Sequence, residues 1–177
     1  RVGAIEEAPS APASMAPPPR WVPSRELSHL LWLLLHFPAQ VAPVLADTDP
    51  SLLSDRRSVL EAIVALAGGA SLAEVADPNR DADLARVLRA IGARDAEYQE
   101  QTAESAARAL VGRLELARVE SEILTINARI AACETSGDKS SYHSLAKEVS
   151  GLYARQRQLK NLVAGRVFRG SGASNTP

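Results

Sequence analysis

Three histidines and one cysteine are the side chains of this sequence best suited to metal binding or nucleophilic chemistry. His29 and His36 are seven residues apart in a leucine-rich stretch, so they share one face of a predicted helix. Two imidazoles without a third ligand make a poor zinc site, and we expect both histidines to be ordinary surface or partly buried residues. Cys133 falls in an apolar helical stripe, where a thiol behaves as a small hydrophobic side chain.

Motifs for phosphate binding or hydrolysis are absent from the sequence. Gly68-Gly69 lacks the remainder of a phosphate-binding loop, and neither a serine-hydrolase elbow nor a helical zinc-protease motif is present. Glu115, Glu120 and Glu122 have the spacing of ordinary acids on a helix surface. We therefore expect no catalytic residue, no bound cofactor, no metal site and no enzymatic activity in this segment.

The composition indicates an all-α globular protein. The 177 residues are 46% hydrophobic and 23% charged, and leucine and alanine prevail over aromatic and β-branched residues. A net charge of -1 gives no attraction to nucleic acid, so we expect no direct nucleic-acid binding. A single cysteine suits the reducing cytoplasm. The longest apolar run, Leu30 to Leu35, is far shorter than the about 20 residues of a membrane span.

Both ends of the chain are predicted to be flexible. Residues 1–23 hold six prolines among alanine and serine, which favours an extended linker over a packed helix. The first residue is Arg1 and the one methionine is Met15, so we expect a piece of a longer protein with a domain upstream. Residues 166–177 are predicted to form a loose C-terminal tail.

Residues 24–98 are predicted to form a bundle of four or five short helices. Ser24 is a plausible N-cap before a leucine stripe that ends at Pro38, and Ser71 with Glu74 makes a capping box. Further helices are predicted over 39–45, broken by Pro43, over 54–67, and over 81–93. The predicted buried face of the helix over 54–67 is Val59, Leu60, Ile63, Val64 and Leu66, and that of the helix over 81–93 is Leu84, Val87, Leu88 and Ile91.

Residues 99–165 are predicted to form a long helix and an antiparallel helical hairpin. Proline is absent from 99–134, and apolar residues there recur at alternating spacings of three and four, as do those after a turn at 135–138. The two stripes have matching lengths, so pairing them buries both. The stripes are Leu116, Val119, Ile123, Ile126, Ile130 and Cys133 on the first helix, and Leu145, Val149, Leu152, Gln156, Leu159 and Val163 on the second.

The end of the second hairpin helix is basic. Residues 112–169 carry ten Lys or Arg against six Asp or Glu, a charge of +4, and no acid follows Glu148. The basic residues are Arg155, Arg157, Lys160, Arg166 and Arg169. Such a run is either an ordinary solvated face or a docking surface for an acidic patch on a partner.

Two segments resemble the C-terminal domain of bacterial DNA primases. They are the leucine-rich stretch Glu26 to Pro38 and the stretch Ser51 to Leu60, which are followed by a long helix, a polar turn and a returning helix, together about 26–163. The resemblance implies a non-catalytic domain of a longer protein that is a DNA-directed RNA polymerase. It implies that this domain docks on the N-terminal collar of the hexameric replicative helicase and couples priming to unwinding. It assigns the contact to the hairpin, where our candidate residues are Tyr153, Arg155, Gln156, Arg157 and Lys160.

Two other functions fit the same pattern of helices. The N-terminal domain of a replicative helicase also begins with a leucine-rich helix, but a motor domain should follow it, whereas this chain ends in a loose stretch from Gly170 to Pro177. A self-associating helical adaptor would use the two apolar stripes between subunits instead of within one chain.

Overall fold

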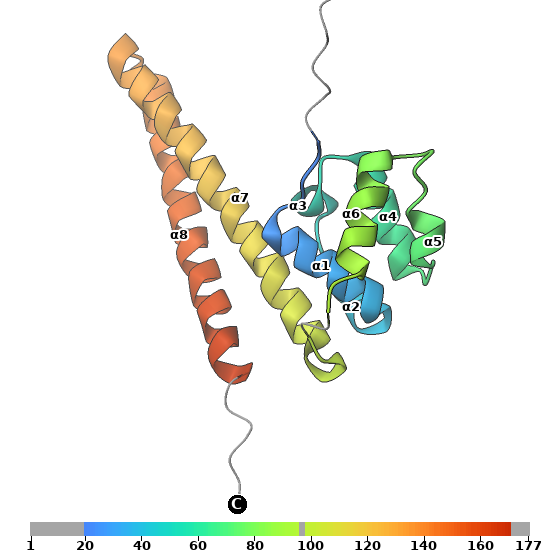
Figure 1. The fold of residues 1–177 in the computed structure, drawn as a ribbon. Coiled ribbons are helices and arrows are strands. Elements are labelled where there is room, and N and C mark those ends of the chain that lie inside the picture. The colour runs from blue at the N-terminus through green and yellow to red at the C-terminus, as the bar shows by residue number, and fades with distance from the viewer. Residues whose placement is uncertain (1–19, 96–97, 171–177) are drawn as a thin grey trace, which may run out of the picture.

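The computed structural model of the chain describes residues 20–95 and 98–170, with side chains as far as Ala164. These residues form helices and no strand, so the predicted all-α class is confirmed. Six short helices precede two long ones in the described residues. The short helices cluster on one side of the first long helix, which pairs with the second (Figure 1). The helices are α1 (Arg25–His36), α2 (Pro38–Ala46), α3 (Pro50–Leu53), α4 (Arg57–Ala67), α5 (Leu72–Val75), α6 (Ala82–Gly92), α7 (Glu100–Ser136) and α8 (Lys139–Gly170).

Helix α1 forms the centre of the bundle. Its leucines at 30, 31, 33 and 34 are all at most 1% exposed, so the helix buries side chains around most of its circumference. A helix that is apolar nearly all round must be covered by other helices. Helices α2, α4, α6 and the first part of α7 contact α1 and cover it.

Polar caps fix where the bundle helices begin. Ser24 accepts a hydrogen bond from the backbone N–H of Leu27, and the predicted capping box of Ser71 and Glu74 is present. Asp81 caps α6 and also accepts hydrogen bonds from Ser58 and Arg56, which ties α4 to α6. The pKa of Asp81 is lowered, mainly by the hydrogen bond that its carboxylate accepts from the Leu84 backbone N–H and further by Ser58 and Arg56.

The predictions for α2 and the start of α4 were wrong in part. Pro43 lies inside α2 without breaking it: one backbone hydrogen bond is lost, while the buried Val41 and Val44 hold the helix on the core. Ser54 does not begin the next helix, because it is extended and closes the one-turn α3, and α4 begins only at Arg57.

The predicted buried face of α4 was also partly wrong. Val64 is 71% exposed and Leu60 only half-buried, while Ala62 joins Val59 and Ile63 in the core. Alanine carries little apolar signal in the sequence, so the pattern favours the larger Val64 over Ala62 for the buried face. On α6 the predicted face is confirmed, since its four residues are all buried.

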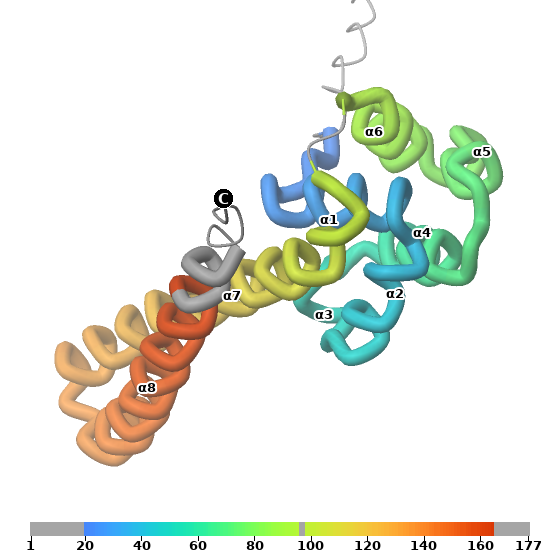
Figure 2. Tube along the Cα trace, turned by 90° about the horizontal axis from the view of Figure 1, so that it is seen from below, coloured from blue at the N-terminus to red at the C-terminus, as the bar shows by residue number. Residues whose placement is uncertain are grey.

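Helices α7 and α8 form the predicted antiparallel hairpin, which projects from the bundle as an arm (Figures 1 and 2). The two predicted stripes pack together, with Val119, Ile123 and Ile126 buried against Leu145, Val149 and Leu159. Gly137, with φ of 74°, closes the turn in a left-handed conformation that favours glycine. The turn is shorter than predicted, because Thr135 and Ser136 continue α7.

Helix α7 belongs to two separate cores. The buried Ala103, Ala107 and Leu110 pack in the bundle, and the hairpin core begins one or two turns later, at Leu116 and Val119. The predicted boundary at 98/99 therefore falls just before a helix that serves both units. Helix α8 continues to Gly170, beyond the predicted end of the hairpin at 165, while 1–19 and 171–177 of the predicted linker and tail lie outside the described residues.

Replacing Leu88 by alanine should destabilise the bundle. Leu88 is 0% exposed, and truncating a leucine at such a site costs about 2–5 kcal/mol through lost burial and an unfilled cavity. Urea unfolding followed by circular dichroism measures the change. Val64→Ala, at a residue that is 71% exposed, is the control and should change the free energy of unfolding by no more than about 0.5 kcal/mol.

Candidate docking surface on the helical hairpin

His29, His36 and Cys133 each contact other side chains of the fold. His29 Nδ1 lies 2.8 Å from the Tyr98 hydroxyl, and the His36 ring packs against Trp32 with the ring centroids 4.2 Å apart. Cys133 is half-buried beside the hairpin core. Within residues 20–95 and 98–164, no three His, Cys, Asp or Glu side chains gather so as to hold a metal ion. The described helices also include none long and apolar enough to cross a membrane.

The hairpin has an inner flank and an outer flank, one on each side of its apolar seam. The inner flank faces the bundle and carries Glu115, Arg118, Glu122 and Arg155, which line a groove of about 290 Å³ together with the loop between α2 and α3. The outer flank lies on the opposite side of the seam. It carries Glu120, Leu124 and Asn127 of α7 with Tyr153, Arg157 and Lys160 of α8.

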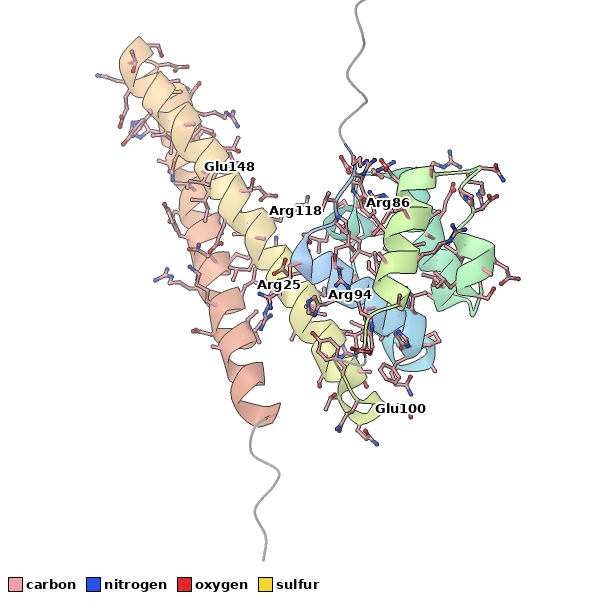
Figure 3. The ribbon with its side chains drawn as sticks, viewed as in Figure 1. Arg25, Arg86, Arg94, Glu100, Arg118 and Glu148 are labelled. Carbon is pink, nitrogen blue, oxygen red and sulfur yellow. The ribbon has the colours of Figure 1, made fainter. Side chains whose placement is uncertain are left out.

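Ion pairs within the chain occupy the inner flank. Arg155 donates a hydrogen bond of 2.5 Å to Glu115 across the hairpin, and this bond raises the pKa of Arg155. Arg118 contacts Glu122 on its own helix and also reaches the bundle, where its Nη1 lies 2.7 Å from Ser51 Oγ and 3.4 Å from an Asp49 carboxylate oxygen. Figure 3 shows Arg118 on the side of α7 that faces the bundle.

Polar bonds across the outer flank pair α8 with α7. One carboxylate oxygen of Glu120 accepts a hydrogen bond from Gln156, at 3.0 Å, and lies 3.2 Å from the Lys160 ammonium as an ion pair. The Asn127 amide donates to the Tyr153 hydroxyl at 3.2 Å. Arg157 is exposed, and none of the ion pairs between described residues involves it.

The five predicted contact residues do not form one continuous surface, because they lie on different flanks of the hairpin and only some of them are paired with α7. Arg155 and Gln156 donate hydrogen bonds to acids of α7, and Lys160 forms an ion pair with one, on different sides of the hairpin, so two cations of the basic run, Arg155 and Lys160, are paired within the chain. Tyr153 and Arg157 are exposed on the outer flank. The side chains of Arg166 and Arg169 lie outside the described part. Which of these residues contacts a partner stays a prediction.

Sequence reasoning missed Leu124. This leucine is 71% exposed and lies on the outer flank, one turn before Asn127. Its signal was present in the sequence, because it is a large apolar residue outside the three-and-four spacing that defines the seam of α7.

Comparison with known proteins identifies the fold. No protein-family model matches the chain, and no curated protein matches its sequence. The solved helicase-binding domain of primase from Mycobacterium tuberculosis is similar, with a TM-score of 0.50 and 14% identity over 80% of this chain and 93% of that chain. The chain has the fold of a primase helicase-binding domain. The predicted resemblance is thus confirmed for the fold. At 14% identity, contact residues have to be assigned from the structure of this chain itself.

Replacing Arg118 by alanine should loosen the hairpin relative to the bundle. The two cores share α7 but no buried residue, and Arg118 adds a second tie through Asp49 and Ser51. Spin labels at the exposed Ala90 and Ser144, in a Cys133→Ser background, measure the distance between bundle and arm. We expect a broader distance distribution for Arg118→Ala than for the control, Arg113→Ala, which is exposed on the same helix. Equal distributions would contradict the role of Arg118.

Proposed function

We propose that this chain is a non-catalytic module of a bacterial primase that docks on the N-terminal collar of the hexameric replicative helicase. The observation that carries the proposal is the fold shared with the primase helicase-binding domain over 80% of the chain. Docking would hold the RNA-synthesising part of the primase at the site of unwinding. The proposal places the chain in the replisome, in the cytoplasm, with the helicase as its partner and no direct contact to nucleic acid.

The hairpin suits such a role because the residues that stabilise it are different from those that a partner can reach. Its own stability comes from the seam, where the apolar side chains of α7 and α8 are buried against each other. The arm projects from the bundle, so the surface away from the seam is accessible along much of its length (Figure 2). A specific protein interface commonly buries about 800 Å² on each partner, an area that a few turns of two adjacent helices can supply.

Self-association through the seams is less well supported by the geometry. The stripes that a coiled-coil adaptor would present to another subunit are already paired within one chain. An open dimer would have to break this pairing before re-forming it between subunits, with a loss of the local connection through Gly137.

Titration of the full chain into the cognate replicative helicase tests the proposal. Isothermal titration calorimetry should give saturable binding to the hexamer, and the same result with the isolated N-terminal collar domains. A helicase fragment that lacks the collar is the control and should give none. A chain that is folded by circular dichroism but gives no saturable binding to the intact helicase would contradict the proposed function.

A further inference from the structure

We infer that the docking surface is the outer flank of the hairpin, centred on Leu124, Tyr153 and Arg157, and that its partner presents an apolar hollow beside a carboxylate. The inference rests on the proposed function for the identity of the partner. It differs from the sequence-based prediction, because it excludes Arg155 and adds a residue of α7.

Leu124 supplies the apolar part of this surface. It is 71% exposed, whereas the neighbouring Ile123 and Ile126 are buried in the seam. Residues three or four apart on a helix are neighbours, so Leu124 lies beside Glu120 and Asn127 on the outer flank. Burying this exposed leucine against a partner would remove apolar surface from water and so contribute favourably to the free energy of binding.

Tyr153 extends the apolar surface across to α8. Its hydroxyl accepts a hydrogen bond from the Asn127 amide, one turn after Leu124, so both residues border the same asparagine. Tyr153 is 43% exposed. Because the bond already orients the ring, the tyrosine side chain loses less entropy when a partner packs on it. Tyrosine is also a residue type common at the centres of interfaces.

Arg157 supplies the charge. It lies four residues after Tyr153 and therefore next to it on the same side of α8. Among the residues named for this flank, Glu120 and Lys160 lie 3.2 Å apart as an ion pair. Arg157 is the remaining charge of this set, and its exposed, planar guanidinium suits bidentate bonds to a carboxylate on the partner.

The inner flank also carries an exposed leucine, Leu162 at 55%, but this residue borders a groove that the hairpin forms with the bundle. Arg155 and Arg118, the arginines that line the inner flank beside the bundle, are already bonded to Glu115, Glu122 and the bundle. A partner would have to displace these bonds, and the bundle covers one side of the groove that they line.

Three substitutions test the outer flank by calorimetry with the N-terminal collar domains of the cognate helicase. Leu124→Asp, Tyr153→Ala and Arg157→Glu should each weaken binding by about tenfold or more, as is usual for central interface residues. Tyr153→Phe retains the ring and should remain within about threefold of the unaltered chain. Arg157→Glu should also reduce the dependence of affinity on salt concentration.

Matched controls come from elsewhere in the same chain. Val64→Asp alters a residue of the bundle that is 71% exposed, as Leu124 is, and Arg129→Glu reverses an exposed arginine on the inner side of the arm. Both controls should bind as the unaltered chain does. Circular dichroism melting of every variant separates lost binding from lost folding.

The outcomes distinguish this inference from the proposed function. If the unaltered chain binds and the flank variants bind equally well, the outer flank is not the docking surface, while the proposed function stands. If the unaltered chain does not bind the helicase, both are overturned. If the free chain sediments as a dimer that Leu124→Asp dissociates, the flank is occupied by a second copy and the inference is also overturned.

Discussion

The continuity of α7 through two cores is the constraint on which the arrangement depends. The first turns of this helix present Ala103 and Ala107 to the bundle, and these small side chains let α7 lie close to the helices it covers. Its later turns present larger residues, such as Ile123 and Ile126, to α8. Because a helix of 37 residues transmits its direction from one end to the other, packing in the bundle sets where the arm points.

Polar pairs across the hairpin set its register more than its stability. The bonds of Arg155 to Glu115 and of Lys160 to Glu120 are largely exposed, and such pairs are individually worth about 1 kcal/mol or less. A shift of either helix by one turn would separate all of these partners at once. The apolar seam provides most of the burial, and the charges determine which residues of α8 lie opposite which residues of α7.

Much of the fold could be predicted because its signals are local. Caps such as Ser24 and Ser71 act within a few residues, and the alternating spacing of the seam residues survives in the structure. The exposed Val64 could not be predicted, because which side of α4 meets the core depends on how the other helices surround it. A helical stripe defined partly by alanine gives too little contrast to decide this from sequence.

The candidate surface could be predicted only in part for a similar reason. Arg155 and Arg157 are two residues apart, yet they lie on opposite sides of the hairpin, and one is bonded to Glu115 while the other is exposed. Sequence composition counts both as members of one basic run. Only the register of α8 against α7 determines which cation remains for a partner.

The tight turn at Gly137 and Asp138 has a consequence for the way the arm folds. Tip residues are neighbours along the chain, so their first contacts close only a short loop, which costs little chain entropy. Farther from the turn, Asn127 bonds to Tyr153, 26 residues away in the sequence, and Glu115 to Arg155, 40 residues away. Once the pairs nearer the turn have formed, the loop that each of these bonds must close is much shorter. This topology favours assembly of the arm outward from its turn, because each new pair then closes only a short additional loop.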